Sequence, residues 1–190
     1  MSLNLPTPSD GSRLRPVEPR HAALCCFALL TISCALASFA LACATPFAAF
    51  AVIAAAILPL RSALLVATGA WLVNQGIGFG ALHYPIDAST LLWGFVIGIA
   101  ALVATVVAAL VFRSVPRGNT PLLLALALLF GYGAYEITLY AATLFLGGAE
   151  NFTASIVGRI GLTNAAWLIG LVAVCEIVRL MGASESPTRV

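Results

Sequence analysis

The feature that most constrains this chain is a succession of long apolar segments with few charges between them. The run from about Ala22 to Cys43 can cross a membrane, because a hydrocarbon core of about 30 Å needs about 20 helical residues. The other segments predicted to be helical are 46–58, 62–84, 91–112, 122–146 and 152–180. Of the 190 residues, 62% are hydrophobic and 8% are charged, which lies outside the range of soluble domains. The sequence therefore predicts an all-α, integral membrane six-helix bundle over residues 21–181, with polar tails at 1–20 and 182–190.

Prolines, glycines and capping residues separate these segments. Pro59 and Pro85 end two of the apolar runs, because proline cannot continue the hydrogen-bond ladder of a helix and disfavours helix in the residue before it. Asp87 stands where its side chain can cap the helix that follows, and Gly147 and Gly148 end the long run before them. The boundaries are thus set by local chemistry and not only by hydrophobicity.

The arginines favour one orientation. With the amino terminus in the cytoplasm, the inside segments hold the arginines outside the helices, and the outside loops hold Asp87 and Glu150. We therefore expect a multipass protein of the bacterial cytoplasmic (inner) membrane with both termini cytoplasmic. No basic patch is large enough to indicate a nucleic-acid partner.

The stretch from Trp71 to Trp93, WLVNQGIGFGALHYPIDASTLLW, places polar side chains inside a predicted helix. Counting about 1.5 Å per residue puts Asn74 and Gln75 about 12 to 15 Å below the outer surface. The same count puts Glu136 about 16 Å and Arg159 about 14 Å below it. Three predicted helices therefore carry their costly groups at one depth.

Helical spacing places these groups on polar and aromatic stripes. The stripes are Trp71, Asn74, Gln75, Gly78 and Phe79; Tyr132, Glu136 and Tyr140; and Arg159, Thr163, Asn164 and Trp167. We expect the stripes to face one cavity. The predicted ligand-binding residues are Trp71, Asn74, Gln75, His83, Tyr84, Trp93, Tyr132, Tyr135, Glu136, Arg159 and Asn164.

A structural role for the same residues remains open. Charged groups inside a membrane cost about 2.5 to 3.5 kcal/mol each and usually face the protein interior. Glu136 and Arg159 are candidates for a buried ion pair, with Asn74 and Gln75 as interhelical hydrogen-bonding groups. His83 and Tyr84 fit either an aromatic belt at the membrane interface or a lid over a ligand.

The motifs of common enzymes are absent. The sequence holds no GxSxG, HExxH or Walker pattern, and GIGFG lacks the strand and turn of a nucleotide-binding loop. His21 and His83 are too few for a haem or multi-histidine metal site. We therefore expect no catalytic activity, no metal and no cofactor.

The number of helices, their predicted topology and the mixed polar and aromatic pocket resemble the substrate-binding S components of energy-coupling-factor vitamin transporters, including the small solitary BtuM-like cobalamin transporters. The resemblance implies an energy-coupling transmembrane subunit and ATPases as partners, with Cys34, Ser38 and Ala42 as the small residues that dock the subunit. The BtuM-like proteins use a pocket cysteine as cobalt ligand. Here the Trp71–Trp93 stretch has none, and His83 is the nearest candidate ligand.

These observations favour uptake of a vitamin-like small molecule by an S-component-like protein in the lipid bilayer, with a pocket in the outer half of the membrane. A structural or assembly subunit of a larger membrane complex is the alternative, and it predicts polar stripes that satisfy one another without a cavity. A channel or ion-coupled carrier ranks third, because the predicted helices 46–58 and 91–112 offer almost no polar residues toward the cytoplasmic side.

Overall fold

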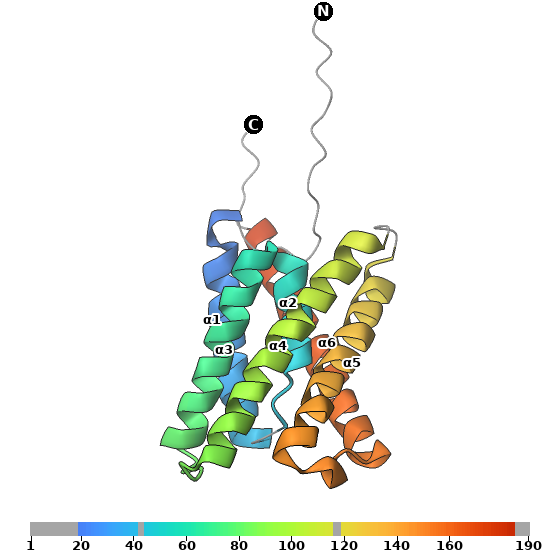
Figure 1. The fold of residues 1–190 in the computed structure, drawn as a ribbon. Helices are drawn as coiled ribbons and strands as arrows, with labels where there is room; N and C mark the ends of the chain where they lie inside the picture. Colours follow the sequence, from blue (N-terminus) through green and yellow to red (C-terminus); the bar gives the residue numbers. More distant parts are fainter. Residues whose placement is uncertain (1–18, 42–43, 116–118, 185–190) are drawn as a thin grey trace, which may run out of the picture.

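The computed structural model describes residues 19–41, 44–115 and 119–184. The secondary structure of these residues consists of helices joined by turns and loops (Figure 1). The helices are α1 (Pro19–Leu41), α2 (Phe47–Ile57), α3 (Leu60–Gly80), α4 (Ala88–Ser114), α5 (Thr120–Leu146) and α6 (Ala154–Ser184), with the short 3-10 helix η2 (Ala149–Asn151) before α6. Among the described helices, all except α2 and η2 are long and apolar enough to cross a membrane. The predicted all-α class is confirmed.

Each predicted helical segment overlaps one of these helices, but several ends differ. Helix α1 begins at Pro19, inside the predicted tail, because the first position of a helix needs no backbone N–H donor. Helix α3 ends at Gly80, four residues earlier than predicted. Helix α6 begins at Ala154 and continues to Ser184, past the predicted start of the second tail. Most of the two predicted tails, residues 1–18 and 185–190, and Cys43 lie outside the described residues.

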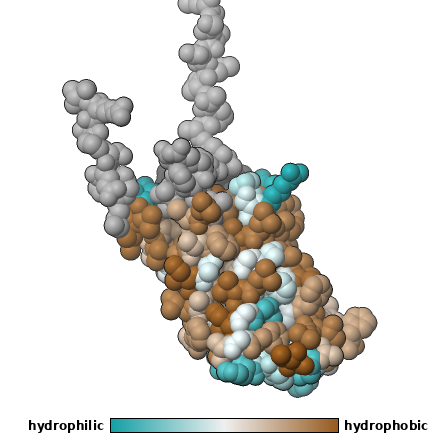
Figure 2. Space-filling view, turned by 90° about the vertical axis from the view of Figure 1, so that its left-hand side faces the viewer, coloured by the Kyte–Doolittle hydropathy of each residue, from teal (hydrophilic) through white to brown (hydrophobic). Residues whose placement is uncertain are grey.

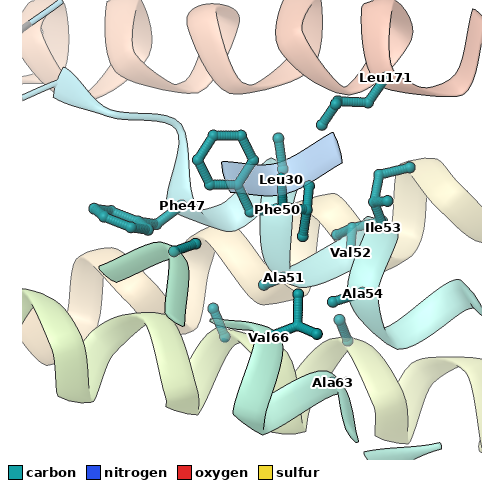
Figure 3. Packing of buried hydrophobic residues seen from close by; sticks show 14 of the residues in the cluster. Leu30, Phe47, Phe50, Ala51, Val52, Ile53, Ala54, Ala63, Val66 and Leu171 are labelled. Atoms are coloured by element: carbon teal, nitrogen blue, oxygen red, sulfur yellow. The ribbon is translucent and has the colours of Figure 1, made fainter. Parts of the chain in front are cut away.

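Helix α2 lies at the centre of the bundle although it is the shortest α-helix described. Its sequence has no polar residue, and a helix that is hydrophobic on every side is expected to be buried. Nine of its 11 residues are buried, and α2 contacts α1, α3, α4, α5 and α6. Figure 3 shows its side chains packed among Leu30 of α1, Val66 of α3 and Leu171 of α6. The other helices are therefore arranged around α2.

A tight turn leads into α2. Pro46 has φ −80° and ψ 62°, and the Phe47 N–H donates to the carbonyl oxygen of Thr45 at 2.8 Å. These values define an inverse γ-turn, a conformation that proline's fixed φ favours. The backbone of Thr45 and Pro46 is therefore non-helical and buried within the bundle.

The ends of the bundle differ in what they hold. The first turn of α1 and the last turns of α6 lie at one end, and the α3–α4 loop and η2 lie at the other (Figure 1). The face over α1 and α3 is largely hydrophobic, with hydrophilic residues gathered mainly at its two ends (Figure 2). Large apolar side chains such as Leu36, Phe39 and Leu65 are exposed on the described surface. This arrangement is what a lipid environment requires of a helical bundle.

Candidate functional site

Asn74 and Gln75 link three parts of the chain. The Asn74 side-chain amide donates to Ser38 Oγ of α1 at 2.9 Å and to Thr45 Oγ1 at 3.0 Å. Gln75 Nε2 donates to Asn74 Oδ1 at 3.2 Å. The Asn74 amide, which was predicted to bind ligand, therefore binds α1 and the segment before α2, and the Gln75 amide binds Asn74.

Trp71 attaches α3 to α4. Its indole Nε1 donates to the carbonyl oxygen of Gly94 at 2.8 Å. The ring lies so close to Gly98 that a Cβ atom there would be 2.7 Å from the indole, and a Cβ at Gly94 would be 2.5 Å from Gln75 Oε1. The two glycines of α4 are therefore required by the side chains of α3 that pack on them.

Asn164 of α6 caps the central helix from a distance. Its Oδ1 accepts the backbone N–H of Ala49 at 3.1 Å, and its Nδ2 donates to its own helix at Ile160 O. Pro46, at the N-cap position of α2, provides no side-chain hydrogen bond. Asn164 is only 1% exposed, so its amide replaces the missing cap within the protein interior.

Two further bonds hold α6 to its neighbours. The Tyr132 hydroxyl of α5 donates to the carbonyl oxygen of Val157 at 2.6 Å, with its ring against Gly161. Trp167 Nε1 donates to Ser33 Oγ of α1 at 2.6 Å. Helices α5 and α6 otherwise have few contacts, and α6 packs more extensively on α2.

A cavity of about 160 Å³ opens where α5 and α6 separate. It is lined by Ala44, Thr45, Tyr135, Glu136, Leu139, Asn151, Phe152, Ile156, Val157 and Ile160. The cavity thus lies between α5, the first turns of α6, η2 and the non-helical segment before α2.

Glu136 is the distinctive group in the cavity wall. Its Oε1 atom is shielded from solvent, and no hydrogen-bond partner for it exists among the described residues. Glu136 lies ten residues before Leu146, the end of α5, which corresponds to about 15 Å along the helix. A carboxyl group that faced lipid at that depth would have no polar partner, which agrees with the place of Glu136 in the cavity wall.

Arg159 does not pair with Glu136. The ion pair found within the described residues joins Arg179 to Glu176 at 2.7 Å, and Arg159 is exposed. Because α6 begins at Ala154, Arg159 is about 8 Å along the helix from its outer end, shallower than the sequence count predicted. Its long side chain can therefore extend toward the membrane surface.

The loop residues lie apart from the cavity. His83 is exposed and has a positive φ of 54°. Tyr84 packs edge to face on Phe79 and covers Gly78, where a Cβ would lie 2.8 Å from the ring. Trp93 lies near Gly148, where an added Cβ atom would be 3.7 Å from the indole. These three predicted ligand residues do not line the cavity.

Asp87 has a structural role at the same end. Its Oδ1 accepts the backbone N–H of Thr90 at 2.9 Å, which makes it the N-cap of α4 as predicted. The bonds from Thr90 hold the pKa of the Asp87 carboxyl below its usual value, because they stabilise the ionised form.

The predicted ligand-binding residues therefore fall into two groups. Tyr135 and Glu136 line the cavity, whereas Trp71, Asn74, Gln75, His83, Tyr84, Trp93, Tyr132, Arg159 and Asn164 do not. The lining residues that sequence reasoning missed come mainly from 151–160 and from Ala44 and Thr45. The sequence feature that could have indicated these lining residues is the pair Gly147 and Gly148. Both have positive φ and turn the chain, so that the residues after them fold back on α5. No group of three His, Cys, Asp or Glu suited to a metal ion occurs in the part of the chain that is described.

Comparisons with models of protein families, with curated proteins and with solved structures found no match. The class of protein consequently follows from the described fold alone. Five of the helices in the described part of the chain are long and apolar enough to cross a membrane, which indicates a multipass membrane protein.

Proposed function

We propose that this chain binds a small molecule in the cavity beside Glu136 and takes it up across the bacterial cytoplasmic membrane, in the manner of an S component. The observation that carries the proposal is the Glu136 Oε1 atom, shielded from solvent and without a hydrogen-bond partner among the described residues. A buried acceptor left unsatisfied costs about 1 to 3 kcal/mol, and more when it is charged. A group of this kind inside a membrane usually marks a functional site.

The proposed orientation places the cavity toward the outside. The start of α1 and the end of α6 lie at one end of the bundle, and the cavity lies toward the opposite end, beside η2. The arginine distribution supports cytoplasmic termini and thus six passages, in which α2 and the segment before it together make the second. The ligand then enters from the outer side.

Helix α2 supports a transport role by its length. Its 11 residues extend about 16 Å, roughly half of a hydrocarbon core. Interrupted helices whose ends lie near the middle of the membrane are a common feature of transporter binding sites. The segment before α2 contributes Ala44 and Thr45 to the cavity wall.

The volume of the cavity limits the ligand. A cavity of about 150 Å³ accommodates a molecule the size of benzene, so 160 Å³ suits a compact ligand and not one as large as cobalamin. The proposed substrate is therefore smaller than most vitamins.

A structural or assembly subunit remains the second candidate. It is favoured by the mutual hydrogen bonding of Asn74, Ser38, Thr45 and Gln75, which leaves this polar cluster no evident ligand role. The cavity beside Glu136 is the observation against it, because that alternative predicts none.

Native mass spectrometry distinguishes the two candidates. The protein is purified in mild detergent, incubated with the small-molecule fraction of a cell extract and examined for a bound mass. Ile160→Trp fills the cavity and should abolish the adduct, whereas Leu162→Trp, on an exposed position of the same helix, should retain it. An adduct that survives Ile160→Trp, or none in the wild type, contradicts the proposal.

A further inference from the structure

We infer that the cavity beside Glu136 is built for a small, monovalent organic cation, of the size and type of a substituted ammonium ion. The inference rests on the proposed function and adds the chemical class of the ligand. It draws on the charge, the aromatic groups and the size of the cavity.

The charge of the cavity lining is negative only. Glu136 is its acidic residue, and none of the ten lining residues is Arg, Lys or His. Arg159, the nearest arginine along α6, is exposed and lies outside the lining. A bound cation would compensate the charge of the carboxylate. A neutral ligand would leave the charge uncompensated, and an anion would be repelled.

Aromatic rings complete the site. Tyr135 and Phe152 both line the cavity, one on α5 and one just before α6. The ring of Phe152 is fixed by an edge-to-face contact with Tyr140, with centroids 5.5 Å apart and an interplanar angle of 74°. Aromatic faces attract cations and are the usual partners of ammonium groups with little hydrogen-bonding capacity.

The remaining wall excludes a metal ion as the ligand. Leu139, Ile156 and Ile160 are aliphatic. One carboxylate, one amide and the hydroxyls of Thr45 and Tyr135 fall short of the roughly six to eight oxygen ligands that a hard cation such as Ca²⁺ takes. The volume is near that of a cavity that holds benzene, which corresponds to about six or seven non-hydrogen atoms. A compact organic cation satisfies the charge, the apolar wall and the volume together.

The experiment uses probes of matched shape and different charge. Choline, its neutral carbon analogue 3,3-dimethylbutan-1-ol and the anion 3,3-dimethylbutanoate are titrated against the full-length protein in lipid nanodiscs by calorimetry. The variants are Glu136→Gln, which keeps the shape of the side chain, and Glu150→Gln, which removes a charge from exposed η2 beside the cavity. The thermal midpoint of each variant without probe verifies folding.

Choline should bind more tightly than its neutral analogue, and Glu136→Gln should weaken it by about tenfold or more, the effect of losing one charge-assisted contact. Glu150→Gln should change it less than about twofold, because exposed charges are screened. Equal binding of choline and the alcohol, or of choline to wild type and Glu136→Gln, overturns the cation assignment, and so does the absence of binding by every probe.

The two proposals fail in distinguishable ways. A bound mass from a cell extract that is lost in Ile160→Trp, combined with no preference for choline, leaves the ligand-binding function standing and removes the cation. Absence of any bound mass removes the function itself.

Discussion

Replacing Asn164 by Leu should destabilise the protein by removing the cap of α2. Leu has the same branching as Asn, so the change keeps the shape and removes the Oδ1 atom that accepts the Ala49 N–H. That N–H is in the first turn of α2, where the helix supplies no acceptor, and Pro46 supplies none from its side chain. Because the site is buried, no water replaces the lost partner.

The expected cost is about 1 to 3 kcal/mol, the penalty for an unsatisfied buried donor. The lost bond from Asn164 Nδ2 to Ile160 O adds little, because that carbonyl already accepts a bond within α6. The total exceeds the roughly 0.6 kcal/mol average for hydrogen bonds between membrane helices, because the Ala49 N–H has no alternative acceptor in its helix.

Reversible unfolding by SDS in mixed micelles, followed by circular dichroism, measures the free energy of unfolding, and hydrogen exchange at the Ala49 amide reports the cap directly. Asn164→Asp keeps the acceptor at a helix N-terminus but places a second carboxylate oxygen against Ile160 O in a buried site, so it should restore only part of the loss. Thr163→Ala, whose hydroxyl bonds only to its own helix at Arg159 O, should cost less than about 0.5 kcal/mol. A value for Asn164→Leu equal to that of Thr163→Ala, with Ala49 exchange unchanged, would mean that Asn164 does not cap α2.

Three other substitutions probe separate parts of the structure. Gly98→Ala should cost about 1 to 3 kcal/mol in SDS unfolding, because the added Cβ would lie 2.7 Å from the Trp71 indole and must displace it. Asp87→Ala should lower the thermal midpoint at pH 7. Hydrogen bonds from Thr90 lower the pKa of Asp87 in the folded state. The difference in midpoint between wild type and Asp87→Ala should therefore be complete above the unfolded pKa of about 3.9 and disappear as pH falls through the folded pKa. Glu136→Gln should raise the free energy of unfolding of the ligand-free protein by on the order of 1 kcal/mol, and with it the thermal midpoint, since a neutral amide is less costly to bury than a carboxylate with an unsatisfied Oε1 atom.

Each of these has a matched comparison. Gly133→Ala adds a Cβ where nothing lies within 4 Å, so a cost equal to that of Gly98→Ala would contradict the packing argument. Ser89→Ala leaves the cap bond of Asp87 to Thr90 in place, and its midpoint should follow wild type over the whole pH range. A lower midpoint for Glu136→Gln would mean that the carboxylate is stabilised in the ligand-free protein.

The fold was largely predictable, because apolar length and local breakers determine where membrane helices lie. The predicted breaks between helices at Pro59 and Pro85 are confirmed, and the cap of α4 by Asp87 was predicted from the position of that residue. The central position of α2 was not predicted. Its lack of polar residues indicates burial, but the partners of a helix buried on every side cannot be deduced from its own sequence.

The site was harder to predict, because depth and helix face must both be correct. Glu136 was placed correctly in depth relative to the end of α5, which Gly147 defines. Arg159 was counted from Glu150, but η2 intervenes and moves the start of α6 to Ala154. Arg159 and Asn164 were assigned to one stripe although five residues correspond to a rotation of about 140° beyond one turn. One is exposed and the other is buried.

The short central helix and the cavity are joined by the segment that precedes α2. Helix α2 extends about half the thickness of a membrane, so the chain passes through the interior at Thr45 and Pro46 in a non-helical conformation. Non-helical backbone at such depth is tolerated only where protein buries it or where it lines a cavity. Here the Thr45 hydroxyl accepts from Asn74, and Thr45 also forms part of the cavity wall that contains Glu136. A non-helical segment, which is narrower than a helix, thus borders the cavity whose wall includes Glu136, and the Oε1 atom of Glu136 has no hydrogen-bond partner among the described residues.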